Sequence, residues 1–558
     1  MGFLARTLTV LLVLYGLVFV VADLALLHAD APLWVGFAFA VVFIGLQYLA
    51  APWFIERVFS IDFSADAMPA AQREFLEGLC RQRGIPVPRM GVIYSGTPNA
   101  FAFGRLRRDA RIVVTEGLLK ICSEEEANAV LAHELGHIVH YDFAVMTLGA
   151  LAPLLLYQVY VWTRNLGDNL RLVSYAAYVS YWVGQFLVMF LSRTREYGAD
   201  HFSAEVTRTP SALSSALMKI AYGMVKERGE ALEAKADKGT SKDAKKDAER
   251  SLQLGTQLGL MGISAASGGE ALMLATNADE AARVMRWDLV NPWAKVYELN
   301  STHPLTALRL KALNKEAVKL GQEPAYPLPD DARKVNWVGF PIEFAVWALP
   351  YALGFVLASW FWVGRKLPLD LPEKTLPMMV IALGATWAVR IAYRYHGSFK
   401  AAKVQELLED VAVSQMRPRA VQIEGEVVGN GVPGAFWSPD LVLQDDSGMM
   451  YLLYRSSVPF GRLFFAMTSV NRLIGNRVTV QGWYRRGLKP YVEMARVESR
   501  VVKSSGSGMI TLFGKRQDGS EAPVEYETLV ERSYSRWIQT AVAGACVAGG
   551  VIWLLNLV

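Results

Sequence analysis

Seven long apolar runs dominate the pattern of hydrophobic and polar positions along this chain. They lie at residues 3–27, 33–55, 143–162, 173–191, 337–363, 376–393 and 538–555. Each is close to or above the length of about 20 residues that a helix needs to cross a bilayer. The first run lacks a small-residue cleavage site and leads directly into the second, so we expect it to be retained. The pattern predicts a multi-pass α-helical membrane protein.

The polar segment after the second run predicts a small mixed fold. Residues 68–83 have the spacing of an amphipathic helix. Short alternating or β-branched segments follow it, at residues 87–93, 100–103 and 111–115. Together they predict a sheet whose exposed edge strand holds an extended peptide through backbone hydrogen bonds, with Asn99 at that edge.

The last third of the chain has a different periodicity. Five alternating or β-branched runs are separated by turn residues, at 420–428, 439–444, 449–454, 477–484 and 490–497. Residues 461–474 predict a helix between the third and fourth strands. Five strands with that insertion are typical of a small OB-like β-barrel.

These patterns divide the chain into segments. We expect two N-terminal spans (1–55), an α+β domain (56–325) with a charged insert (226–250), two spans (337–393), a β domain (415–505) and a C-terminal span (538–555). The runs 143–162 and 173–191 fall inside the α+β domain and contain several tyrosines. Burial in protein instead of lipid is therefore the alternative for those two runs.

Charge sets the expected orientation. Lysine and arginine crowd the segments after the second, fourth and sixth runs, which by the positive-inside rule places the α+β domain and the N-terminus in the cytoplasm of a bacterial inner membrane. The net charge of +5 then needs no nucleic acid to explain it. Arg485, Arg486, Lys489 and Tyr491 would be candidates for nucleic-acid binding by the barrel, but spans on both sides of it favour a scaffold or substrate-presenting role.

The most specific chemistry lies at His133-Glu134-Leu135-Gly136-His137, inside a predicted helix. Side chains four residues apart on a helix differ by about 40° around its axis, so both imidazoles reach one metal ion. Glu134 is then placed to take a proton from a water in the open coordination position. This H-E-x-x-H pattern predicts a catalytic Zn²⁺ site, and two histidines without a metal are the alternative.

A catalytic zinc site takes a third protein ligand, and Glu196 is the candidate. It directly follows the fourth apolar run, where a helix would emerge from the membrane. Asp200 is one helical turn further on and would accept the free imidazole N–H of a ligand histidine. The alternative is a helix-end salt bridge of either carboxylate with Arg193 or Arg195.

Four motifs in order resemble those of the membrane-embedded gluzincin metalloproteases, which contain the HtpX heat-shock proteases and the type 1 CAAX prenyl proteases. They are Pro98-Asn99-Ala100-Phe101-Ala102, the H-E-x-x-H pentad, Glu196-Tyr197-Gly198-Ala199-Asp200 and Ser301-Thr302-His303-Pro304. The resemblance covers about residues 51–313. It implies that His133, His137 and Glu196 bind zinc, Glu134 is the general base and Asp200 supports a ligand.

His303 matches the T-H-P motif of that family, where the resemblance implies a residue that enters the cleft and steadies the oxyanion. A turn before a helix at 305–320, with Arg309 structural, is the alternative. We expect a zinc-dependent endopeptidase that cleaves unfolded or membrane-associated polypeptides. A membrane scaffold with a structural zinc ion and a prenyl-protein processing protease are the rival functions.

Overall fold

The computed structural model describes residues 13–14, 33–164, 170–221, 278–328, 335, 337–359, 374–430, 440–487, 490–502 and 526–557. Nearly all of the first apolar run, the charged insert at 226–250 and several loops lie outside these residues. The chain forms two compact units. Unit 1 contains residues 1–231, 241–273 and 295–329, and unit 2 contains the rest.

Unit 1 contains a three-stranded sheet, as predicted. Its strands are β1 (Arg89–Ile93), β2 (Ala100–Phe103) and β3 (Arg111–Thr115), in the order β1-β3-β2. β1 runs parallel to β3, whereas β2 pairs antiparallel with β3 and forms one edge of the sheet. β3 is buried at every position, as expected for a central strand.

Among the described residues of unit 1, several helices surround or extend this sheet. They are α2 (Leu33–Phe59), α3 (Ala70–Arg83), α4 (Glu116–Ile121), α5 (Glu124–Val139), α6 (Asp142–Thr163) and α7 (Arg171–Thr207). A 3-10 turn, η1 (Arg107–Asp109), precedes β3. The unit also contains the end of α12 (Pro292–Leu299) and all of α13 (Thr306–Lys319). One core joins Leu76 of α3, Ile112 of β3, Leu131 of α5 and Leu313 of α13.

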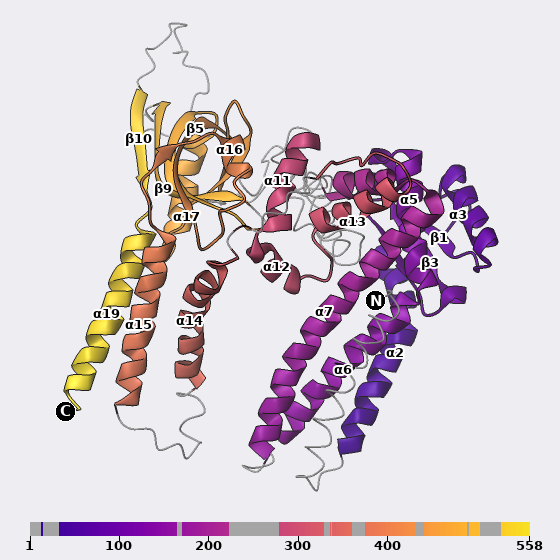
Figure 1. The fold of residues 1–558 in the computed structure, drawn as a ribbon, viewed down its shortest axis with the longest axis horizontal. Helices are drawn as coiled ribbons and strands as arrows, with labels where there is room; N and C mark the ends of the chain where they lie inside the picture. The colour runs from indigo at the N-terminus through magenta and orange to yellow at the C-terminus, as the bar shows by residue number, and fades with distance from the viewer. Residues whose placement is uncertain are drawn as a thin grey trace, which may run out of the picture. The chain divides into compact units, whose positions relative to one another are not determined.

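α7 is a single helix of 37 residues that combines two predicted features. Its first half is the fourth apolar run, which packs along α6 through Ala177 and Leu191 (Figure 1). Its second half is buried among the elements around the sheet and carries Glu196 and Asp200. The same rigid helix therefore connects an apolar segment to the predicted metal site.

Unit 2 contains further long helices and a β-barrel. The helices are α11 (Ala278–Val290), α14 (Phe340–Ser359), α15 (Thr375–Arg394), α16 (Val404–Leu408) and α19 (Ser535–Leu555). The strands are β4 (Lys400–Ala401), β5 (Arg419–Asn430), β6 (Leu441–Gln444), β7 (Met449–Leu453), β8 (Arg477–Arg485), β9 (Tyr491–Val502) and β10 (Tyr526–Arg532).

Five of these strands close into a barrel. β5 pairs with both β6 and β8, β6 pairs with β7, and β9 closes the ring between β7 and β8. The expected inserted helix is broken into α17 (Gly461–Phe465), a π turn at Ala466–Val470 and α18 (Asn471–Leu473). The five-stranded barrel is confirmed, and its assignment as OB-like stays a prediction. β4 and β10 were not predicted from the sequence.

Among the described residues, six helices are long and apolar enough to cross a membrane. They are α2, α6, α7, α14, α15 and α19, which correspond to the second to seventh predicted runs. α6 and α7 are about one third buried within the protein, more than the other four. Part of each of these two runs is therefore buried against protein, which was the alternative to burial in lipid.

Candidate metal centre

Local sequence sets the position of helix α5. Ser123 accepts a hydrogen bond from the backbone N–H of Glu126, and the Glu126 carboxylate accepts one from the backbone N–H of Ser123. This capping box starts the helix about two to three turns before His133. A β-carbon at Gly136 would lie 3.0 Å from Ala199 Cα, so the glycine lets α5 and α7 cross closely.

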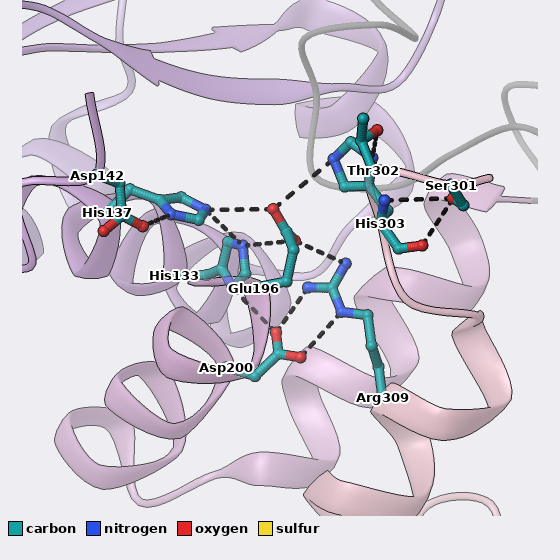
Figure 2. A network of polar contacts seen from close by, with 9 residues as sticks. All are labelled: His133, His137, Asp142, Glu196, Asp200, Ser301, Thr302, His303 and Arg309. Atoms are coloured by element: carbon teal, nitrogen blue, oxygen red, sulfur yellow. Dashed lines mark hydrogen bonds and ion pairs between the residues drawn. The ribbon is translucent and has the colours of Figure 1, made fainter. Parts of the chain in front are cut away.

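The crossing brings His133, His137 and Glu196 together, as Figure 2 shows. Their candidate ligand atoms all lie within 4.8 Å of one another. The two histidine Nε2 atoms are 3.2 Å apart, and each lies 3.7 Å from a different oxygen of Glu196. His133 is fully buried, and burial lowers its pKa to about 4, which keeps its imidazole neutral and able to bind a metal.

These distances fit a tetrahedral zinc ion. Nitrogen and oxygen ligands at about 2.0–2.2 Å from such an ion lie about 3.3–3.6 Å from each other. The Glu196 Oε2 atom is buried and has no hydrogen-bond partner among the described residues. A buried carboxylate oxygen without a hydrogen-bond partner, next to two imidazole nitrogens, is a donor set that fits a zinc ion.

Asp200 lies behind His133. Its Oδ1 atom is 3.0 Å from His133 Nδ1, the ring nitrogen that faces away from His137 and Glu196. Arg309 of α13 contacts the same carboxylate and also lies 3.4 Å from Glu196 Oε2. These contacts contain features of both alternatives raised from the sequence. Asp200 contacts a histidine, and an arginine pairs with the carboxylates. That arginine, however, comes from the distant helix α13.

Asp142 contacts the Nδ1 atom of His137, just as Asp200 contacts the Nδ1 atom of His133. The sequence alone did not identify Asp142. Its Oδ2 atom is 2.6 Å from His137 Nδ1. Arg195 pairs with the same carboxylate and donates to the backbone oxygen of His140 at 2.5 Å. The available signal was an acidic residue at the start of α6, five positions after the second histidine.

Glu134 lies on the same helical turn as the two histidines and is buried. The backbone N–H of Ala102, in edge strand β2, donates a hydrogen bond to its carboxylate. Burial raises the pKa of Glu134 to about 7, and the nearby His137 opposes this shift. A carboxyl group with such a pKa accepts and releases protons near neutral pH.

His303 enters the cluster from the loop before α13. Figure 2 shows that its side chain points toward Glu196. The Nε2 atom lies 3.7 Å from Glu196 Oε1, and the side chain is only 11% exposed. Ser301 Oγ donates to the backbone oxygen of His303 at 2.7 Å. Arg193 of α7 donates to the backbone oxygens of Glu298 and Ser301, both at 2.6 Å, and so fixes this loop on α7.

Asn99 directly precedes β2, which forms one edge of the sheet. Its side chain is fully buried. Its Oδ1 atom accepts from the backbone N–H of Ala100, and its backbone pairs with the backbone and the hydroxyl of Thr115. These bonds join the start of β2 to the end of β3, and a substrate-binding role for Asn99 stays a prediction.

Comparisons with known proteins identify relatives of this chain. Residues 70–317 match the model of peptidase family M48. The chain is 39% identical over 213 residues to a protease HtpX homolog of Methanothermobacter thermautotrophicus, covering 37% of this chain and 81% of the relative. It is 30% identical over 200 residues to the protease HtpX of Legionella pneumophila, covering 33% and 71%.

A solved structure is also similar. The crystal structure of S. mikatae Ste24p matches 56% of this chain and 65% of its own, at 18% identity and a TM-score of 0.31. The family match ends at residue 317, before the barrel begins at β5. Both HtpX relatives are matched over more than two thirds of their length. The chain therefore belongs to peptidase family M48, alongside the HtpX proteases, and is a multi-pass membrane metalloprotease.

Proposed function

We propose that the protein is a zinc-dependent endopeptidase that hydrolyses unfolded or membrane-associated polypeptides. The observation that carries this proposal is the convergence of His133, His137 and Glu196 within 4.8 Å, with Glu134 on the same helical turn. A structural zinc site would be closed by four protein ligands, whereas three ligands leave a position open for chemistry.

Zinc held by these three residues would supply Lewis acidity for a water molecule and for the scissile carbonyl. The chain itself moves the protons. Glu134 takes a proton from the attacking water and delivers it to the leaving amine, for which a pKa of about 7 is well suited. His303 donates a hydrogen bond to the oxyanion that develops on the carbonyl.

Edge strand β2 is the proposed site for the backbone of the substrate. One side of β2 pairs with β3, and no further strand is described on its other side. An extended peptide would add there as a strand. Since Asn99 is buried, this contact would come from the main chain of β2 and not from the Asn99 side chain.

The geometry of α7 supports substrates in or beside the membrane. Leu191, the last residue of the fourth apolar run, precedes Glu196 by five positions, which is about 7–8 Å along a helix. The clustering of lysine and arginine after the apolar runs supports a site facing the cytoplasm of a bacterial inner membrane. In this proposal the barrel presents substrates or acts as a scaffold.

Glu134→Gln tests the mechanism. The full chain, purified in detergent, should keep its zinc but cleave casein at least about 100-fold more slowly, because the amide cannot accept the proton. Glu125→Gln, an exposed change in the first turn of the same helix, is the matched control and should leave both zinc content and cleavage unchanged.

The same assay separates the protease from a scaffold with a structural zinc ion. For a protease, removal of zinc by a chelator stops cleavage and added zinc restores it. Unchanged turnover by Glu134→Gln would rule out the assigned general base. Wild-type chain that contains zinc but cleaves neither casein nor a membrane-anchored unfolded substrate would favour the scaffold.

A further inference from the structure

Three arginines of unit 2 converge on one buried carboxylate where the barrel meets helix α15. Glu493 of β9 is 2% exposed, and its Oε1 atom accepts a hydrogen bond from the Tyr395 hydroxyl at 2.6 Å. Its Oε2 atom lies 2.8 Å from Arg485 Nε, 3.6 Å from Arg394 Nη2 and 3.9 Å from Arg455 Nε. One negative charge therefore faces three positive charges.

Arg485 makes the shortest contact with Glu493 among the three arginines. Its Nε donates to the carboxylate, and its other two nitrogens donate to the backbone oxygens of Gln415 and Arg394 at 2.8 and 2.7 Å. Arg394 and Arg455 approach the same oxygen only at longer range. These two guanidinium groups are therefore in excess over the acid that they face.

Arg390 adds a further positive charge one helical turn before Arg394. It is 7% exposed, and its guanidinium lies 4.5 Å from the centre of the Tyr351 ring and 5.5 Å from that of Trp387. Arg390 Nη1 and Arg394 Nε are buried and have no hydrogen-bond partner among the residues that the structure describes. A buried guanidinium N–H group without a hydrogen-bond acceptor is energetically unfavourable, so a bound ligand that supplies an acceptor would stabilise it.

These arginines lie at the end of a helix that is long enough to cross a membrane. α15 packs along α19, and Gly384 and Gly550 allow close contact because a β-carbon at either would meet the other helix within 3 Å. α15 ends and α19 begins beside the barrel (Figure 1), where Ser533 Oγ donates to the backbone oxygen of Arg455 at 2.5 Å. The last turn of α15 would therefore lie at the depth of the lipid headgroups.

We propose that Arg390, Arg394 and Arg455 form a binding site for the phosphate group of an anionic phospholipid. A phosphate presents oxygens that match the paired N–H groups of guanidinium, and basic pockets at the ends of membrane helices bind such headgroups. Tyr351 and Trp387 have the amphipathic rings that favour the membrane interface. The lipid supplies the missing acceptors and anchors the barrel to the membrane surface.

The test uses the full chain in uncharged detergent and does not depend on protease activity. Native mass spectrometry measures retention of dioleoyl-phosphatidylglycerol against dioleoyl-phosphatidylcholine, which has the same acyl chains and no net charge. Wild type should prefer phosphatidylglycerol. R390Q/R394Q should lose about fivefold of that preference for each arginine removed, the usual effect of one charge at an anionic surface.

Lys374→Gln is the matched control, because it removes one positive charge from the opposite end of α15. This variant should keep the wild-type preference. If the double variant does not fold, R394Q is tested alone, and its preference for phosphatidylglycerol should fall about fivefold. Equal retention of the two lipids by wild type, or an unchanged preference in the variants, would overturn the proposal. Displacement of the lipid by inorganic phosphate alone would assign the site to free phosphate and overturn the lipid assignment.

Discussion

Arg309 holds Asp200 with two hydrogen bonds, from Nε to Oδ2 at 2.9 Å and from Nη2 to Oδ1 at 2.6 Å. Both side chains are buried, and the carboxylate in turn contacts His133. The pairing raises the pKa of Arg309, although burial opposes this shift. A helix more than 100 residues away in sequence therefore holds the carboxylate that contacts the proposed metal ligand His133.

Arg309→Gln should weaken zinc binding. Without the guanidinium, Asp200 becomes an unpaired buried charge, and the loss of such a partner costs about 3–5 kcal/mol of unfolding free energy. Loss of a residue that orients a metal ligand also lowers metal affinity about 10–100-fold. Zinc titration and thermal unfolding measure the two effects.

Two further variants make the Arg309 result interpretable. Arg309→Lys keeps the charge but not the two-pronged geometry, and should fall between wild type and Arg309→Gln. Lys319→Gln removes an exposed charge from the last turn of the same helix, and should change the unfolding free energy by less than about 1 kcal/mol. Wild-type zinc affinity in Arg309→Gln would contradict the assigned role.

Asp142→Asn should lower zinc affinity about 10–100-fold, because His137 loses the carboxylate that fixes its tautomer. Arg195 would also lose its ion-pair partner. Isothermal titration with zinc measures the change, and Glu116→Gln, an exposed change on α4, is the control. An Asp142→Asn variant that binds zinc as tightly as wild type would show that His137 needs no such support.

His303→Gln should reduce kcat about 100- to 1,000-fold and leave zinc content unchanged, because a donor to the oxyanion acts only in the transition state. Steady-state kinetics and metal analysis on the same samples measure both values. His201→Gln, at an exposed position on α7, should have no effect. Loss of zinc with normal turnover per remaining zinc would instead identify His303 as a metal ligand.

Gly136→Ala should destabilise the protein even though alanine favours helices. The added β-carbon would lie 3.0 Å from Ala199 Cα and 3.3 Å from a Phe202 ring carbon. Overpacking costs about 1–3 kcal/mol, which exceeds the gain of about 1 kcal/mol in helix propensity. Thermal unfolding should therefore occur at a lower temperature.

Gly78→Ala is the control, for which we expect the opposite change in stability. Gly78 lies within α3, and nothing is within 4 Å of its added β-carbon. Only the propensity gain remains, so this variant should be more stable by up to about 1 kcal/mol. If Gly136→Ala were stabilised to the same degree, close contact between α5 and α7 would not be required.

The sequence by itself determined the local features of this protein. The lengths of the apolar runs predicted the spans, because crossing a bilayer depends on one continuous segment. His133 and His137 could be paired from the sequence, since four residues along a helix fix their relative position. The barrel strands were visible for a similar reason, because alternation records which face of each strand is buried.

Only the tertiary structure decided which distant groups meet. Asp142 and Arg309 follow no local periodicity, and their roles depend on how α6 and α13 pack against α5 and α7. The sequence placed Asn99 at the sheet edge, but only the structure shows that the residue is buried and hydrogen-bonded to Thr115. The buried pair of Asp200 and Arg309 was hidden from the sequence, because the neutralising partner lies 109 residues away.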